Sequence, residues 1–285
     1  MKEIAVISGK GGTGKTTLVA SLIPYLKDVV IADCDVDAPD LDILLKSKVD
    51  IVDDYIGSRR PVINTNICTE CGSCYELCKF KAITSDIDII KERCEGCSVC
   101  EYVCDIGAIT MEDSVVGQIF EGSTDYGKMV HARLIPGEEN SGKLVSEVRE
   151  RAKQKAEETN AKYILIDGSP GIACNVISSI TGVDMVIIVI EPTQSGMHDL
   201  ERVYNLTKQF SLEAYVVINK CGLSDIEEKK IEEYCDKFDI EIILRIPFNR
   251  ILVEAISHRE IPSVYSKEFF DSIKFKKLVN ETKRS

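Results

Sequence analysis

The stretch Ile4–Thr17, IAVISGKGGTGKTT, decides the fold. A short apolar run at residues 4–7 leads into a glycine-rich loop, and an apolar helical pattern follows over residues 18–26. Four residues of the loop match G-x-x-x-x-G-K-[ST], namely Gly9, Gly14, Lys15 and Thr16. In this motif backbone N–H groups and the helix N-terminus hold phosphates, while the lysine and the hydroxyl serve phosphate and Mg²⁺. The sequence therefore predicts a phosphate-binding loop between a strand and a helix.

The expected nucleotide contacts of this loop form one continuous set, with Thr16 also ligating Mg²⁺: Gly9, Lys10, Gly11, Gly12, Thr13, Gly14, Lys15, Thr16 and Thr17. Lys10 is the most specific of them. A lysine here resembles the deviant Walker signature of the MinD/ParA-like ATPases and the nitrogenase iron protein. The resemblance implies ATP and an ATP-dependent homodimer in which Lys10 reaches across the interface. A solvated loop lysine is the alternative.

Aspartates follow two apolar strand-like runs, and the same resemblance assigns roles to Asp35 and Asp167. Asp35 lies in ADCDVDAPDLD and is expected to position the attacking water as switch I, while Asp33 supports the metal shell. Asp167 begins DGSPG, which resembles Walker B and switch II, and would act through Mg²⁺-bound water. Gly171 would let the backbone approach the γ-phosphate. The expected catalytic residues are therefore Lys10, Lys15, Asp35 and Asp167.

Apolar runs alternate with helical segments along the rest of the chain. Runs at residues 163–166, 185–190 and 215–218 are each followed by a helical pattern. This alternation predicts an α/β fold with a doubly wound, mostly parallel sheet of the P-loop NTPase type. The resemblance places adenine contacts at Asn219 and Pro247.

Eight of the 12 cysteines fall into two runs with the spacing C-x2-C-x2-C-x3-C. They are Cys68, Cys71, Cys74 and Cys78, followed by Cys94, Cys97, Cys100 and Cys104. This is the two-cluster bacterial ferredoxin pattern, in which the fourth cysteine of each run ligates the other cluster. We therefore expect one 4Fe-4S cluster on residues 68, 71, 74 and 104, and another on residues 94, 97, 100 and 78. Zinc is the alternative, although this layout is not that of a zinc ribbon.

The sequence departs from the ferredoxin pattern at one point. Ferredoxin runs usually end in Cys-Pro, whereas Lys79 and Asp105 follow the fourth cysteines here. The departure affects the expected turn geometry and reduction potential rather than the ligand set. We expect a P-loop ATPase domain at residues 1–59 and 113–285, interrupted between the switches by a small α+β ferredoxin-like domain at 60–112.

The remaining cysteines are expected to be small buried hydrophobic residues: Cys34, Cys174, Cys221 and Cys235. Cys174 carries an alternative, because the nitrogenase iron protein has a bridging-cluster cysteine shortly after its switch II aspartate. Near the C-terminus, SKEFFDSIKFKKLVNE is amphipathic, and we expect its apolar residues to pack on the ATPase. A membrane-binding helix, as in some MinD-like proteins, is the alternative.

Composition narrows the partners and the location. The chain has 35 Lys and Arg residues and 47 Asp and Glu residues, so its formal net charge is 35 − 47 = −12. Because such a surface repels other anions, neither nucleic acid nor an anionic membrane is the expected partner. The chain begins MKEIAVISGK, which leaves no room for a secretory signal, and has no run of about 20 apolar residues. We expect a cytoplasmic protein with reduced thiols and no integral membrane contact.

Three functions fit these features. The first is nucleotide-gated electron transfer or iron-sulfur cluster delivery to an unidentified acceptor or client protein. The second is a MinD/ParA-like regulatory or positioning ATPase whose clusters hold structure or sense redox state. The third, amidating synthetase chemistry, ranks low because no glutaminase domain is appended. Paired ferredoxin-type clusters favour the first function.

Overall fold

The computed structural model describes residues 1–138 and 141–284. The chain divides into two compact units, each described by itself. The first comprises Met1–Val52, Ile119–Arg133 and Ser141–Ser285, and the second comprises Asp53–Gln118 and Leu134–Asn140. The second unit contains the expected insert, residues 60–112, and extends beyond it on both sides.

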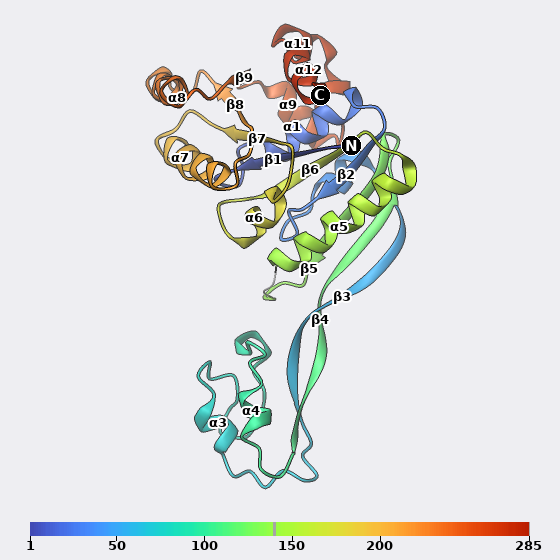
Figure 1. The fold of residues 1–285 in the computed structure, drawn as a ribbon, viewed down its shortest axis with the longest axis vertical. Coiled ribbons are helices and arrows are strands. Elements are labelled where there is room, and N and C mark those ends of the chain that lie inside the picture. The colour runs from blue at the N-terminus through green and yellow to red at the C-terminus, as the bar shows by residue number, and fades with distance from the viewer. Residues whose placement is uncertain (139–140, 285) are drawn as a thin grey trace. The chain divides into compact units, whose positions relative to one another are not determined.

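The sheet carries its strands in the order β3-β4-β5-β2-β6-β1-β7-β8-β9 (Figure 1). Their bounds are β1 Lys2–Ser8, β2 Val29–Asp33, β3 Lys48–Ile63, β4 Ile109–Ser123, β5 Gly127–Leu134, β6 Tyr163–Pro170, β7 Met185–Ile190, β8 Ala214–Cys221 and β9 Ile242–Pro247. Every pairing from β5 through β9 in this order is parallel. The predicted mostly parallel sheet is confirmed.

The helices of the first unit are α1 Lys15–Leu22, α2 Leu41–Leu45, α5 Ser141–Thr159, α6 Cys174–Ile180, α7 Gln194–Gln209, α8 Asp225–Phe238, α9 Arg250–Ser257, α10 Pro262–Tyr265, α11 Lys267–Ser272 and α12 Lys276–Lys283. The second unit contains α3 Ser73–Leu77 and α4 Val99–Tyr102. Strand and helix alternate throughout the parallel part of the chain, which is the doubly wound arrangement expected from the sequence.

Helices cover both faces of the sheet because its central strands are apolar on both sides. Ile4 and Val6 of β1 belong to a buried cluster that includes side chains of α1, α2 and the C-terminal helices. Gly168 of β6 lies against Ile7 and against Ser179 of α6, so Ile7 faces the opposite layer. Such strands are typical of a parallel sheet buried between two helical layers.

The C-terminal segment packs on the ATPase unit as predicted. Phe270 and Leu278 are almost fully buried, and the ring of Phe275 packs edge-on against Phe270. Within residues 1–138 and 141–284, no helix is both long enough and apolar enough to cross a bilayer.

Register brings the site residues to one edge of the sheet. Asp33 of β2 pairs with Asp167 of β6, and Ser8 of β1 pairs with Pro170. The phosphate loop starts immediately after Ser8. Because the carboxyl ends of parallel strands meet at the same edge, the loop and both aspartates lie together where such folds bind ligands.

Candidate nucleotide site and cysteine pockets

The phosphate loop ends at the N-terminus of α1, which presents free backbone donors. The first turn of this helix carries no acidic residue and no side-chain cap. The hydroxyl of Thr13 is buried and has no hydrogen-bond partner among the described residues. Unpaired N–H groups at a helix N-terminus attract anions, so this arrangement fits a phosphate group.

Two glycines of the loop are required by close contacts. A Cβ on Gly9 would lie 2.3 Å from Cβ of Asp199. Gly14 has φ of 94°, and a Cβ there would lie 2.2 Å from Nδ2 of Asn219. A side chain at either position would displace the loop, because real Cβ atoms do not approach so closely and left-handed φ is strained for most residues.

Lys15 lies among three aspartates at the centre of the site. Its Nζ is 2.6 Å from Oδ1 of Asp167 and 3.5 Å from Oδ2 of Asp35. Asp33 is fully buried and accepts hydrogen bonds from the backbone N–H groups of Asp35 and Leu41. Of the predicted catalytic residues, Lys15 therefore contacts both Asp35 and Asp167.

Burial and the charges of neighbouring groups shift the pKa values of the residues in this cluster. Burial and the nearby Asp167 hold the pKa of Asp33 well above its usual range, although Lys15 acts against them. Burial also raises the pKa of Asp35, again opposed by Lys15. Burial lowers the pKa of Lys15, but the Asp167 and Asp35 carboxylates outweigh it, so that pKa ends above its ordinary value. Lys15 is the cation that opposes the upward pKa shifts of Asp33 and Asp35.

The donor set fits Mg²⁺. Three carboxyl groups surround a single ammonium group, so the site has an excess of acidic groups that a divalent cation would offset. Oδ2 of Asp167 is buried and has no hydrogen-bond partner in the described part of the chain. Thr16 is the second residue of α1 and supplies the hydroxyl of the motif. Carboxylate and hydroxyl oxygens are the ligands that Mg²⁺ prefers.

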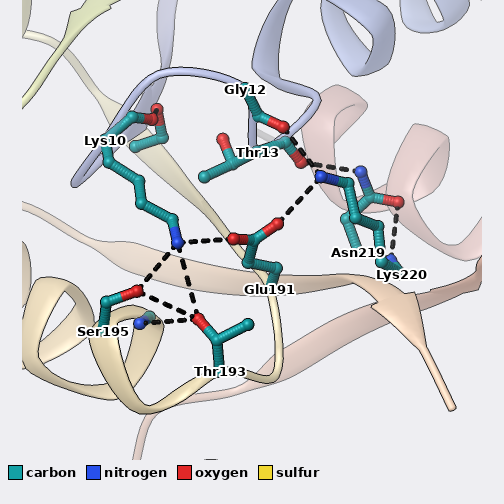
Figure 2. Close-up of polar contacts among 10 residues, drawn as sticks. Lys10, Gly12, Thr13, Glu191, Thr193, Ser195, Asn219 and Lys220 are labelled. Atoms are coloured by element: carbon teal, nitrogen blue, oxygen red, sulfur yellow. Dashed lines mark hydrogen bonds and ion pairs between the residues drawn. The ribbon is translucent and has the colours of Figure 1, made fainter. Parts of the chain in front are cut away.

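Lys10 pairs within its own chain (Figure 2). Its Nζ lies 2.5 Å from Oε1 of Glu191 and donates to the hydroxyl of Ser195 at 2.8 Å. Oε2 of Glu191 accepts from Lys220, which also donates to the carbonyl of Gly12. Burial acts to raise the pKa of Glu191, but the hydrogen bonds from the two lysines lower it overall. One carboxylate thus holds two lysines beside the phosphate loop.

A cavity of about 160 Å³ lies next to the loop, where adenine contacts were expected. Asn219 and Pro247 both line it, together with Gly12, Gly14 and Thr17. The side-chain amide of Asn219 donates to the carbonyl of Thr13 at 2.7 Å, which fixes its orientation (Figure 2). The structure thus brings both expected base contacts to one cavity beside the phosphate loop.

The predicted switch II segment lies at the end of β6. Gly171 has φ of 98°, and its N–H donates to the carbonyl of Ser8, the last residue before the loop. Cys174 follows at the start of α6 and is exposed, so the prediction of a buried residue is wrong there. Cys34 and Cys235 are buried, and burial raises the pKa of Cys235 to about 12.

The eight cysteines of the two runs line two separate pockets in the second unit. One contains Cys68, Cys71, Cys74 and Cys104, and the other contains Cys78, Cys94, Cys97 and Cys100. These groupings coincide with the two expected ligand sets, each with one cysteine from the other run. No three or more His, Cys, Asp or Glu side chains in the described ranges are grouped so that they could hold a single metal ion.

The backbone of the second unit repeats with the period of 26 residues that separates the two cysteine runs. Left-handed φ angles occur at three related pairs, Glu70 and Gly96, Gly72 and Ser98, and Lys81 and Gly107. In each repeat a backbone N–H donates to the fourth cysteine sulfur, from Ala82 to Cys78 and from Ala108 to Cys104. Such N–H···S contacts stabilise thiolates and tune cluster potentials, so the chemistry of the two donor sets is compatible with 4Fe-4S clusters.

Residues 4–262 match the family model described as the CobQ/CobB/MinD/ParA nucleotide binding domain. This match covers more than half of the chain. The chain belongs to the CobQ/CobB/MinD/ParA family. The members of this family are P-loop ATPases, and the prediction of an ATPase is confirmed.

The chain is also similar to a relative and, in fold, to solved structures over almost its whole length. The chain is 34% identical over 275 residues to the uncharacterized protein MJ0578 of Methanocaldococcus jannaschii, covering 95% of this chain and 94% of the relative. The fold is similar to MinD of Pyrococcus horikoshii with Mg-ADP, at TM-score 0.58 and 19% identity, covering 99% of this chain and 96% of that one. The MinC:MinD cell division protein complex of Aquifex aeolicus contains a chain with a similar fold, at TM-score 0.59 and 19% identity. That match covers 100% of this chain and 97% of the other.

Sequence reasoning missed Glu191 and the ion pair that Lys220 makes with it. Both side chains contact the P-loop region although they lie some 180 and 210 residues downstream of Lys10 and Gly12. A signal for Glu191 was present, because a carboxylate directly after the buried run at residues 185–190 would lie at the same sheet edge as the loop.

Proposed function

We propose that this ATPase is a nucleotide-driven switch whose cysteine-rich unit carries two 4Fe-4S clusters that sense redox state. Family membership and the MinD-like fold favour the switch over the electron-transfer function that the sequence alone placed first. The observation that supports it most directly is the loop lysine, Lys10, held beside the three-carboxylate site. A lysine held by a surface carboxylate can exchange that partner for phosphate.

In this proposal Lys15 and the backbone of the phosphate loop hold the β- and γ-phosphates, and Asp167 and Thr16 hold Mg²⁺. Asp35 accepts a hydrogen bond from the attacking water, so that a lone pair of the water oxygen points at the γ-phosphate. Lys10 leaves Glu191 and binds phosphate of a second copy, which gives an ATP-dependent homodimer. Client proteins would then recognise the dimer.

Electron transfer or cluster delivery is the second candidate, and the two cysteine pockets favour it. Each pocket gathers three cysteines of one run and the fourth of the other. The eight thiolates would hold the clusters, which would supply one-electron chemistry when bound. Both candidates place the protein among reduced thiols, as in the cytoplasm.

Iron content and assembly state test the proposal together. Protein purified without oxygen should contain about eight iron atoms per chain, and the Cys71→Ser and Cys97→Ser variants should each lose about four. A non-hydrolysable ATP analogue should convert monomer to dimer in light scattering, and Lys10→Ala should remain monomeric. Bound zinc in place of iron would contradict the cluster assignment, and a wild-type monomer at saturating analogue would contradict the switch.

Redox state distinguishes the two candidates. A sensor requires that reduction change the affinity for nucleotide, with a typical coupling of about fivefold or more. Equal affinities in the oxidised and reduced protein, together with ATP-stimulated reduction or cluster transfer to an acceptor, would favour the second candidate.

A further inference from the structure

His131 lies within β5, opposite the carboxyl end of β2, and is not among the residues of the nucleotide site. Its parallel partner in β2 is Asp33, and its side chain is only 5% exposed. The imidazole stacks on Phe120 of β4, with ring centroids 4.8 Å apart and planes 11° apart. On the other side, Nε2 lies 3.8 Å from Oδ2 of Asp42. His131 therefore contacts both β4 and the first turn of α2.

The first turn of α2 is the end of the predicted switch I segment. One oxygen of Asp33 accepts from the N–H of Asp35, and the other accepts from the N–H of Leu41, the first residue of α2. Asp42 is the next residue and faces His131. The segment from Asp35 to Leu41 is short, and both of its ends are hydrogen-bonded to Asp33. A displacement of Asp35 is therefore expected to displace the start of α2 as well.

The contact between His131 and Asp42 is incomplete. At 3.8 Å the two atoms are too far apart for a hydrogen bond. Nδ1 of His131 and Oδ1 of Asp42 are both buried without a partner in the described part of the chain. Buried polar groups are nearly always paired, and these two atoms belong to the same two side chains as the open contact between Nε2 and Oδ2, so the two groups have unused capacity for a hydrogen bond. A shift of α2 by about 1 Å would bring Nε2 of His131 and Oδ2 of Asp42 to hydrogen-bonding distance.

The charges around the imidazole favour its neutral form. Burial lowers the pKa of His131, the Asp42 carboxylate opposes this effect, and Arg133 reinforces it. Phe120, which covers one face of the ring, has no charge. The imidazole can therefore gain or lose a hydrogen bond to Asp42 without a large change in the charge of the core.

Phe120 connects this contact to the cysteine-rich unit through the chain itself. It lies on β4, which begins at Ile109, five residues after the cluster cysteine Cys104. We propose that His131 is a positioning residue that links switch I to β4, so that movement of α2 on ATP binding alters the strand leading to the cysteine-rich unit. The inference rests on the proposed switch role of Asp35.

Hydrogen exchange of the full-length, anaerobically purified protein tests this link. Exchange is followed by mass spectrometry at saturating Mg-ADP and at saturating Mg with a non-hydrolysable ATP analogue. In the wild type, peptides from residues 35–45 and 115–121 should both change their exchange rates between the two nucleotides, by about fivefold or more. His131→Phe keeps an aromatic ring beside Phe120 and removes the nitrogens. It should retain the response at 35–45 and lose it at 115–121.

Two further variants make the test decisive. Asp42→Ala removes the carboxylate that faces His131. It should likewise retain the response at residues 35–45 and lose it at 115–121, so it decides the outcome if His131→Phe does not fold. Asp37→Ala, an exposed position in the same segment, should keep both responses. The link is overturned if β4 of the wild type does not respond to nucleotide. It is also overturned if β4 still responds in both the His131→Phe and the Asp42→Ala variants. Hydrogen exchange in these peptides does not measure iron, so a failure of the cluster assignment appears separately in the iron content.

Discussion

Replacing Lys15 with alanine should destabilise the ATPase unit even in the absence of nucleotide, and more at high pH than at low pH. Lys15 is 5% exposed, and its Nζ lies 2.6 Å from Asp167 and 3.5 Å from Asp35. With an effective dielectric constant of about 20, these separations correspond to attractions of about 6 and about 5 kcal/mol. Desolvation of the buried ammonium offsets several kcal/mol of this sum, so the net loss in Lys15→Ala should be about 3 to 5 kcal/mol.

The pH dependence follows from the carboxylates that remain. The pKa values of Asp33 and Asp35 are already raised in the folded protein, and removing Lys15 raises them further. A carboxyl group with a raised folded-state pKa binds more protons folded than unfolded. Its stabilising contribution is therefore complete below the unfolded pKa of about 4 and is lost as pH rises through the folded pKa. The stability gap between wild type and Lys15→Ala should widen from pH 5.5 to pH 8.

Urea unfolding with EDTA and without nucleotide measures this gap, followed by circular dichroism because the chain contains no tryptophan. The urea midpoint of Lys15→Ala should be lower by about 1 to 2 M at pH 8. Lys10→Ala is the matched control, since its ion pair with Glu191 is partly exposed and should contribute at most about 1 kcal/mol. A loss of equal size at both pH values, or no loss, would refute the assignment of Lys15 as the cation that compensates the three carboxylates.

Two further predictions concern the nucleotide itself. Asp35→Ala should keep ATP affinity but lower the hydrolysis rate by about 10² to 10⁴-fold, because Asp35 positions water rather than phosphate; equal loss of affinity in calorimetry would show that the switch is misassigned. Gly9→Ala should weaken ATP binding by about 1 to 3 kcal/mol, because the new Cβ would meet Asp199 at 2.3 Å and displace the loop. Gly11→Ala, at a position with open space, is its control, and equal affinities in the two variants would contradict the steric argument.

Much of the nucleotide site could be predicted from sequence because it depends on local signals. The phosphate loop is continuous in the chain, and Asp33 and Asp167 each directly follow an apolar run of a strand. Once these strands were expected to be parallel, their carboxyl ends had to lie at the same edge. The contact of Lys15 with Asp35 and Asp167 agrees with this reasoning.

Contacts between distant strands could not be predicted in the same way. The partner of Lys10 follows β7, and Lys220 lies in β8, so their meeting at Glu191 depends on the strand order β1-β7-β8. The pairing of His131 with Asp42 likewise requires β5 to lie beside β2. Periodicity predicts which face of a strand is buried, but it does not specify which strand is the neighbour.

The place where the cysteine-rich segment enters the chain makes coupling to nucleotide physically reasonable. β3 begins at Lys48, 13 residues after Asp35, and only α2 and a two-residue connection separate it from the predicted switch I segment. β4 returns from the segment and is followed by β5, whose His131 faces the same helix. Both strands that join the two units are thus connected to α2, one through the chain and one through a side-chain contact. A movement of α2 of about 1 Å, the distance needed to close the His131 contact, would therefore act on both strands at once.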